Sequence, residues 1–280
     1  MKRIAIQGEI GSFHDIAARQ YFRDEQIQLI CCATFEQVFE NVKRDPTAIA
    51  MMAIENTIAG SLLHNYELLR DSGTTVVGEH KLHISHCICC LPEDSWETVR
   101  EVHSHPVALM QCRGFLANHP ELKAVEAEDT AGSAKYIAEN RCRSWAAICS
   151  VEAAEMYGLR ILEANIEDNK HNFTRFLVTC NPHKADFLRP LEKTNKSSLV
   201  FSLPHEEGSL SQVLSILSFY KINLTKIQSL PIIGHEWEYM FYIDVLYDNL
   251  TRYRQSIDAI MPLTKELQIL GEYNEAKNPV

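Results

Sequence analysis

Short apolar runs alternate with amphipathic helical patterns over the first 180 residues. RIAIQG, QLICCA and AIAMMAIEN are nearly continuous apolar runs, and GSFHDIAARQYF and TFEQVFENVKR between them have helical periodicity. Strands that are apolar on both faces are typical of a parallel or mixed sheet with helices on both sides. We therefore expect residues 1–180 to form an α/β domain.

This domain is expected to have two lobes. Residues 74–91, TTVVGEHKLHISHCICCL, form a long β-rich stretch interrupted only by Gly78, and we interpret it as a strand that crosses between lobes. The alternation of strands and helices then resumes, so a second lobe is predicted over about 76–168. Ligands of open α/β sheets bind in crevices at the carboxyl ends of the strands, which predicts a ligand cleft between the lobes.

The pattern changes after residues 181–196, NPHKADFLRPLEKTNK. This stretch has two prolines and many charges, and we predict that it is a linker. Residues 197–275 then follow the order β-α-β-β-α-β, which is the ferredoxin-like α+β arrangement. Because such a sheet leaves an edge and one face open, pairing with a second copy of the chain is expected.

Composition excludes several classes of protein. Lys plus Arg number 27 against 37 Asp plus Glu, a formal net charge of −10, which argues against non-specific binding of nucleic acid. A small anionic substrate remains compatible, because a local pocket can be basic on an acidic protein. The N-terminal apolar run is too short for a signal peptide and no stretch approaches a membrane helix, so a cytoplasmic protein with nine free thiols is expected.

Two motifs follow apolar strands in the first part of the chain. Gly8, Gly11, Ser12 and Phe13 form G-x-x-G-S-F before a helix, where exposed backbone N–H groups suit an anion. The alternative is a tight turn in which Ser12 only caps the helix. IENTIAGS, residues 54–61, ends a buried strand where ligands bind, and the alternative is that its polar residues cap the next helix.

Two further motifs lie later in the domain. His103-Ser104-His105-Pro106 enters a helix with a hydroxyl and N–H donors, although capping by Ser104 with proline at the first helical position explains it equally well. NFTRF, residues 172–176, precedes a strand, and its arginine is suited to bidentate binding of a carboxylate.

A metal site is not expected. His80, His83 and His86 lie near Cys87, Cys89 and Cys90. Alternate residues of a strand point to opposite faces, so His83 would face away from His80 and His86.

Together and in this order, the motifs resemble the prephenate dehydratase family from about residue 3 to residue 274. The resemblance is carried by GEIGSFHDIAA, AIENTIAGSLLHNYELL, VHSHPVALMQC, DTAGSAKYIAE, AAICSVEAAEMYGL and NFTRF. The C-terminal stretches KSSLVFSLPHEEGSLSQVL, INLTKIQSLP and WEYMFYID resemble the family's ACT regulatory domain. Because the resemblance begins near the first residue, the monofunctional form without a chorismate mutase segment is expected.

The resemblance implies a two-lobed α/β catalytic domain, similar to periplasmic type II binding proteins, followed by an α+β ACT domain. It implies a carbon–oxygen lyase that converts prephenate to phenylpyruvate, water and CO2 in phenylalanine biosynthesis, with no cofactor and no metal. Allosteric control by L-Phe and assembly into a homodimer or homotetramer are also expected.

The resemblance also assigns residues. Thr174 is the implied donor to the departing hydroxyl oxygen, by proton transfer or by a hydrogen bond alone, and Glu55 and Asn56 are further catalytic candidates. The expected substrate-binding residues are Gly11, Ser12, Phe13, Thr57, Gly60, Ser61, Ser104, His105, Asn172, Arg175 and Phe176. The expected L-Phe contacts, between ACT domains of paired subunits, are Gly208, Ser209, Leu210, Asn223, Leu224, Gln228 and Ser229.

The chain departs from the family pattern at several positions. His14 replaces a common serine, and Val107 replaces the glutamine of a Ser-His-Pro-Gln element. Gln228 and Leu230 stand where Glu-Ser-Arg-Pro is usual, a motif that helps to form the L-Phe site in relatives.

Two alternatives stay open. ENTIAGSLLHNYELL also resembles plant arogenate dehydratases, whose substrate carries an amino group in place of the keto group. A non-catalytic amino-acid sensor is the second alternative, because two-lobed clefts and ACT domains also occur in ligand sensing.

Overall fold

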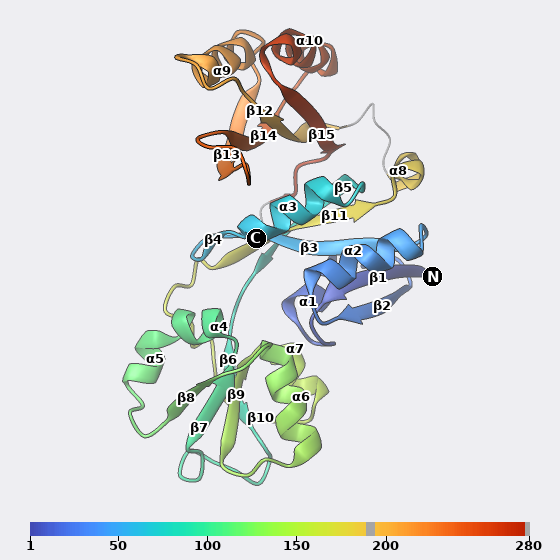
Figure 1. The fold of residues 1–280 in the computed structure, drawn as a ribbon. Coiled ribbons are helices and arrows are strands. Elements are labelled where there is room, and N and C mark those ends of the chain that lie inside the picture. Colours follow the sequence, from blue (N-terminus) through green and yellow to red (C-terminus); the bar gives the residue numbers. More distant parts are fainter. Residues whose placement is uncertain (189–193, 278–280) are drawn as a thin grey trace.

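Two β-sheets organise the chain in this computed structural model, which describes residues 1–188 and 194–277 (Figure 1). Ten strands form the larger sheet in the order β13-β14-β12-β15-β5-β11-β3-β1-β2, with β4 paired to β3. Five strands form the smaller sheet in the order β10-β6-β9-β7-β8. Figure 1 shows three parts: the first lobe in the middle, the second lobe below it in green, and the C-terminal domain, residues 194–277, above it in orange and red.

The first lobe contains the predicted parallel strands. Its strands are β1 (Lys2–Gln7), β2 (Ile27–Cys32), β3 (Ile49–Asn56), β4 (Gly60–Ser61), β5 (Thr75–His83) and β11 (Phe173–Cys180). Its helices are α1 (Phe13–Tyr21), α2 (Phe35–Arg44), α3 (Leu63–Asp71) and α8 (Pro182–Leu188). β1, β2 and β3 run parallel, and β11 lies antiparallel between β3 and β5. The first six residues of β3 are buried, as expected for a strand covered on both faces.

Helix caps in this lobe follow the sequence signals. Ser12 Oγ accepts a hydrogen bond from Asp15 N at 3.3 Å at the start of α1. At the start of α2, Thr34 Oγ1 accepts from Gln37 N at 3.4 Å, and Gln37 Oε1 accepts from Ala33 N, the residue before the cap, at 3.0 Å. These caps place the strand-to-helix turns at the carboxyl ends of the strands.

The second lobe is built on the smaller sheet. Its strands are β6 (Cys87–Cys90), β7 (Glu101–Ser104), β8 (Lys123–Glu126), β9 (Trp145–Cys149) and β10 (Arg160–Ala164). Its helices are α4 (Pro106–Gln111), α5 (Arg113–Ala117), α6 (Thr130–Asn140) and α7 (Val151–Met156). Two apolar clusters cover its two faces, one centred on Cys87, Cys89 and Ala147 and the other on Ile88, Val102 and Ile148.

The stretch 74–91 is two strands and not one. β5 pairs with β11 in the larger sheet, and β6 pairs with β9 and β10 in the smaller sheet. Ile84 N, in the break between them, donates a 2.7 Å hydrogen bond to Asn172 O. The chain therefore crosses between lobes near residue 84 and not near 76, because β5 is held along its length by β11.

The C-terminal domain has the predicted β-α-β-β-α-β order. Its elements are β12 (Lys196–Ser202), α9 (Ser209–Phe219), β13 (Asn223–Pro231), β14 (Tyr239–Leu246), α10 (Leu250–Ile260), a short 3-10 helix (Met261–Leu263) and β15 (Glu266–Tyr273). The two helices pack on one sheet face through a cluster that includes Phe201, Val213 and Tyr253.

The opposite face of this sheet is covered within the same chain. Tyr242, Met240 and Leu230 share an apolar cluster with Ile54 and Leu177 of the first lobe. The expectation of an open face is therefore wrong, although β13 remains at the end of the strand order. β15 also reaches β5 through one pair, Gly271 with Val76, where a side chain on Gly271 would collide with Val76 O.

The predicted linker is partly helical. Residues 182–188 form α8, with Pro182 at its start, where proline is favoured. Ala185 of α8 is buried in the core of the first lobe, so this segment is part of that lobe. Residues 189–193 of the predicted linker lie outside the described residues.

Two properties concern the described residues as a whole. All nine cysteines lie among them as free thiols. No helix in ranges 1–188 and 194–277 has the length and apolar character needed to cross a membrane.

Candidate active site

A cavity of about 440 Å³ lies between the two lobes. The first lobe lines it with the start of α1 and the ends of β3 and β11, and the second lobe with α4 and the residues before α6. Six residues expected at the site line it: Ser12, Phe13, Asn56, His105, Thr174 and Phe176. The predicted cleft is therefore present, and it lies at the carboxyl end of β3.

Thr174 is the second residue of β11 and is 9% exposed. Asn56 Nδ2 donates to Thr174 Oγ1 at 3.0 Å, across the register pair that joins β11 to β3. Because the Thr174 oxygen accepts this bond, its own O–H is directed elsewhere, and no acceptor for it lies among the described residues. Thr174 can therefore donate a hydrogen bond to a ligand in the cavity.

Asn56 is held on both sides of its amide. Its Nδ2 also donates to Asn172 Oδ1 at 2.7 Å, and its Oδ1 accepts from Ile58 N at 2.9 Å and Ala59 N at 2.8 Å. These bonds allow only one orientation of the amide, with nitrogen toward Thr174. The alternative that Asn56 caps the next helix is wrong, because the N-cap of α3 is Leu62 and the Asn56 amide oxygen instead holds the turn between β3 and β4.

Gln111 on α4 was not anticipated from the sequence. Its Nε2 donates to Asn56 Oδ1 at 3.4 Å, and its Oε1 lies 2.9 Å from His86 Nε2. Burial lowers the pKa of His86, so the ring is neutral and donates from Nε2 to the amide oxygen. This chain of contacts connects the second lobe to the residue that orients Thr174.

His14 also lines the cavity. Ala53 N donates to His14 Nε2 at 3.2 Å, and burial lowers the pKa of His14 to about 4. The ring is therefore neutral at pH 7, with its hydrogen on Nδ1 as a donor. The ring packs against Phe176, with centroids 5.0 Å apart. The sequence marked this position only as a departure from the family pattern.

The turn before α1 acts differently from the expectation. Gly11 N donates to Asp15 Oδ2 at 2.8 Å, so the chain itself uses an N–H that was assigned to substrate. Gly11 has φ +87°, and a Cβ there would lie 2.9 Å from Ala153 Cα in the second lobe. Ser150 Oγ also donates to Gly11 O at 2.7 Å. Gly11 is therefore a contact between the lobes and does not line the cavity.

Ser104 is wrongly assigned to substrate binding. It is fully buried, and its Oγ donates to Ile148 O at 2.6 Å inside the second lobe. The cap of α4 is instead His105, whose Nδ1 accepts from Val107 N at 3.2 Å.

Arg175 and Glu55 face away from the cavity, because alternate strand residues point to opposite faces. Arg175 Nη2 lies 2.6 Å from Asp244 Oδ2 of the C-terminal domain, and its Nε lies 3.2 Å from Glu55 Oε2. Lys226 Nζ donates to Glu55 Oε1 at 2.7 Å and to Ser61 Oγ at 2.8 Å. The substrate role expected for Arg175 and Ser61 and the proton-source role considered for Glu55 are therefore corrected: all three bind the C-terminal domain.

The remaining expected residues support the cavity wall without lining it. Thr57 Oγ1 donates to His171 O at 3.0 Å and accepts from Phe173 N at 2.9 Å. Asn172 is fully buried, and its Oδ1 accepts from Asn56 Nδ2. Gly60 of β4 pairs with Asn56 of β3.

The histidines considered as metal ligands do not converge. His80 contacts Gln20, His83 contacts Lys170 O, and His86 contacts Gln111. The sulfurs of Cys87, Cys89 and Cys149 instead lie within 4.8 Å of one another in the core of the second lobe. Cys90 belongs to the cluster on the opposite face of the sheet.

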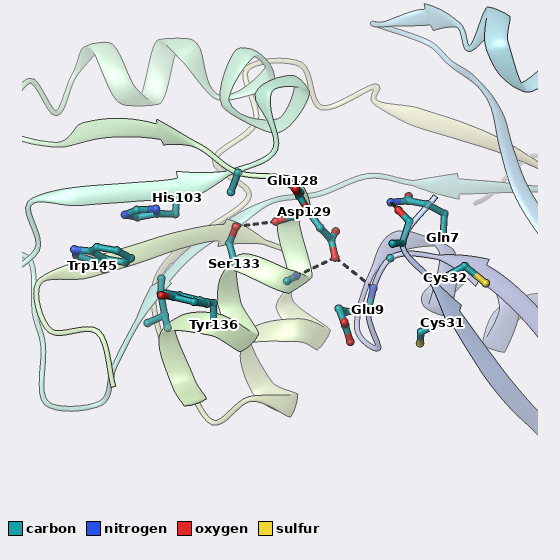
Figure 2. A pocket seen from close by; sticks show the side chains of 15 residues that line it. Gln7, Glu9, Cys31, Cys32, His103, Glu128, Asp129, Ser133, Tyr136 and Trp145 are labelled. Carbon is teal, nitrogen blue, oxygen red and sulfur yellow. Dashed lines mark hydrogen bonds between the residues drawn. The ribbon is translucent and has the colours of Figure 1, made fainter. Parts of the chain in front are cut away.

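A second hollow of about 520 Å³ adjoins the cavity and shares Glu128 and Asp129 with it (Figure 2). In Figure 2, Asp129 Oδ2 bridges the lobes by accepting from Glu9 N at 3.3 Å and from Gly132 N at 3.0 Å. Glu9 also pairs with Lys135 at 3.0 Å. Asp129 was not anticipated, although an aspartate before T-A-G is a helix N-cap signal.

The residues expected to contact L-Phe lie in separate places of one chain. Gly208 is the N-cap of α9, and a hollow of about 120 Å³ beside it is lined by Ser209 and Leu210. Asn223 and Leu224 line another hollow of about 390 Å³ beyond the other end of α9. The two groups do not form one site within a chain.

Comparison with known proteins gives consistent matches. The family model described as prephenate dehydratase matches residues 4–184. Arogenate dehydratase 3, chloroplastic, from Arabidopsis thaliana is 36% identical over 97% of this chain, which spans 66% of that relative, about two thirds of its length. The structure of prephenate dehydratase from Arthrobacter aurescens in complex with L-Phe is 26% identical, with a TM-score of 0.85 over 99% of this chain and 92% of that one. A structure described as a novel type of quorum quenching acylase is 31% identical, with a TM-score of 0.84 over 98% of both chains.

Proposed function

Because the chain belongs to the prephenate dehydratase family, we propose that it converts prephenate to phenylpyruvate, water and CO2. The observation that carries the proposal is the Thr174 hydroxyl, which accepts from Asn56 and keeps its own hydrogen for a ligand in the interlobe cavity. Prephenate needs one such donor, directed at the oxygen of its ring hydroxyl.

The chemistry explains why one weak acid suffices. Loss of the hydroxyl together with CO2 makes the ring aromatic, so the reaction is strongly downhill and its barrier lies in expelling hydroxide. A donor on the departing oxygen stabilises the charge that develops there. The high pKa of a threonine hydroxyl favours donation of a hydrogen bond by Thr174 over outright proton transfer.

Neutral donors around Thr174 are suited to the carboxylates of the substrate. His14 Nδ1–H and the hydroxyl of Ser12, whose oxygen already accepts from Asp15 N, are two such donors on the cavity wall. Residues from both lobes line the cavity, so an approach of the lobes around bound substrate would expel water. The proposed reaction requires no cofactor and no metal.

The test is phenylpyruvate formation by the purified chain from prephenate, with and without a chelator. We expect chelator-resistant turnover that falls about 10²–10³-fold in Thr174→Val. Unchanged turnover in Thr174→Val would overturn the role of this hydroxyl, and absence of turnover in the unmodified chain would overturn the activity.

Arogenate is a second candidate substrate, favoured by the carboxylates on the cavity wall. Glu36, Glu128 and Asp129 line the cavity, and an ammonium group is attracted by carboxylates where a keto group is not. The ratio of kcat/KM on arogenate to kcat/KM on prephenate decides between the two substrates. Glu128→Gln is expected to lower this ratio if arogenate is preferred.

Release of acid from an N-acyl amide in the same preparations tests the activity named for the acylase relative.

The C-terminal domain is proposed to be an ACT regulatory domain that responds to L-Phe. Its β-α-β-β-α-β order supports this, and the Arthrobacter aurescens relative was solved with L-Phe. Ser209 and Leu210 line a hollow at one end of α9, and Asn223 and Leu224 line one beyond the other end, so a site that contains both groups needs two copies of the chain, which supports a homo-oligomer. Inhibition of turnover by L-Phe together with an increase in mass in solution would support this assignment, and inhibition of a monomer would refute the shared site.

A further inference from the structure

Six charged side chains join the first lobe to the C-terminal domain, and we name them the interdomain ion cluster. They are Glu55, Glu79 and Arg175 of the first lobe and Lys196, Lys226 and Asp244 of the C-terminal domain. Three cations and three anions balance each other. All except Glu55 have side chains no more than 10% exposed.

Arg175 occupies the centre of the cluster. Its guanidinium reaches Asp244 at 2.6 Å, Glu79 at 3.0 Å and Glu55 at 3.2 Å. Burial alone would lower the pKa of Arg175, but Asp244 and the other surrounding groups raise it well above its ordinary value. Burial likewise would raise the pKa of Asp244, but Arg175 and the hydroxyl of Ser198 hold it below its usual range. Both groups are therefore charged and depend on each other.

The C-terminal domain contributes from three of its strands. Lys196 on β12 lies 2.9 Å from Glu79, Asp244 is on β14, and Lys226 on β13 binds Glu55 at 2.7 Å. Ser198 Oγ fixes Asp244 by donating to its Oδ1 at 2.5 Å. Because three strands of the C-terminal sheet contribute charged side chains, a displacement of that sheet would move the interdomain ion cluster.

Two of the three first-lobe residues of the cluster, Arg175 and Glu55, are chain neighbours of active-site residues. Arg175 follows Thr174 on β11, and Glu55 precedes Asn56 on β3. The strands pair Thr174 with Asn56 and Arg175 with Glu55, and the register then shifts at a bulge before Phe176. Two adjacent rungs of one ladder therefore carry the ion cluster on one face and the Asn56–Thr174 hydrogen bond on the other.

We propose that the interdomain ion cluster positions Thr174 and Asn56, so that turnover depends on how the C-terminal domain is docked on β3 and β11. Arg175, Glu55, Lys226 and Asp244 act as positioning residues and do not touch the substrate. This inference rests on the proposed dehydratase function for its kinetic consequences, and it gives that function a route of regulation. A partner or effector that shifts the C-terminal sheet moves the rungs that carry the active site.

The kinetic test uses Lys226→Met and Asp244→Asn, each alone and in a Thr174→Val background. Each single variant is expected to lower kcat on prephenate at least about fivefold, with a much smaller change in KM. In the Thr174→Val background the same changes are expected to have little further effect, because the residue they position is gone. Lys226→Arg keeps the cation and is expected to retain turnover.

The control is Arg254→Met, which breaks a 2.6 Å ion pair with Glu272 within the C-terminal domain and contacts neither β3 nor β11. It is expected to keep the kcat of the unmodified chain at a comparable Tm. An equal loss in Arg254→Met would show that general destabilisation is responsible, and would overturn the inference.

A second readout is independent of the reaction. Hydrogen exchange of the unliganded chain is expected to speed up at backbone amides of residues 54–57 and 173–176 in Lys226→Met, and not in Arg254→Met. If the unmodified chain fails to turn over prephenate, the proposed function fails and this comparison still decides the inference. Unchanged exchange at both segments in Lys226→Met would overturn it.

Discussion

The side-chain amide of Asn56 donates a 3.0 Å hydrogen bond to Thr174 Oγ1, and this bond leaves the Thr174 hydrogen free for a ligand. The bond joins two strands that are 118 residues apart in the chain but adjacent in the sheet. The candidate chemistry depends on this one orientation, since an amide turned the other way would compete for the same hydrogen.

Removal of the Thr174 hydroxyl is the most direct test. Thr174→Val keeps the shape of the side chain and deletes the donor, and turnover of prephenate is expected to fall about 10²–10³-fold. Thr174→Ser keeps the donor and is expected to retain most of the turnover. Steady-state rates and the Tm of both variants check this, and equal losses in the two would indicate that packing and not the hydroxyl matters.

Asn56→Asp is expected to abolish most of the turnover without a change in size. A carboxylate cannot donate to Thr174, and it would face Asn172 Oδ1, which lies 2.7 Å from the present amide nitrogen. A loss of roughly 10²-fold in kcat is expected, comparable to the removal of one catalytic donor. The control is Asn118→Asp, which adds the same charge at an exposed position at the C-terminal end of α5. This variant is expected to keep the kcat of the unmodified chain.

The buried, neutral His14 is expected to lower the free energy of unfolding of the chain in acid. Its pKa is lowered by burial to about 4 in the folded chain, against about 6.5 when unfolded, so the unfolded state binds the extra proton first as the pH falls. The contribution of neutral His14 to stability is therefore complete above pH 6.5 and is lost between 6.5 and 4. Relative to His14→Gln, the chain is expected to lose about 2 kcal/mol by pH 5 and about 3 kcal/mol by pH 4.

Urea unfolding of the two proteins from pH 7 to pH 4 measures this difference. Because all other titrating groups are shared, they cancel in the comparison. Parallel stability curves would show that His14 is not held neutral by the fold.

Gly11→Ala is expected to weaken contact between the lobes. The new Cβ would lie 2.9 Å from Ala153 Cα, at a backbone φ of +87°. Gly73→Ala is the matched control, because Gly73 has φ +69° with open space around its position and so suffers the backbone strain alone. Both are expected to lose about 1–3 kcal/mol of stability, and only Gly11→Ala is expected to raise KM for prephenate. An equal KM in the two variants would contradict a role for this contact in closing the cavity.

Local chemistry accounts for what was correct from the sequence about the fold. The buried β3 strand and the β-α-β-β-α-β order each depend on residues a few positions apart. The linker prediction is wrong for residues 182–188, because prolines and charges are local signals, whereas the burial of Ala185 depends on packing against strands that are remote in the chain.

The sequence by itself determined that Asn56 lies at the end of one strand and Thr174 at the start of another, with Glu55 and Arg175 beside them, because strand periodicity is a local property. Only the tertiary structure decided which of these polar neighbours faces the cavity. Both faces of the ladder carry polar groups, so periodicity alone cannot tell a substrate site from an ion cluster. On one face of the ladder, Asp244 and Lys226 of the C-terminal domain pair with Arg175 and Glu55. On the other face, Gln111 of the second lobe contacts Asn56 beside the cavity.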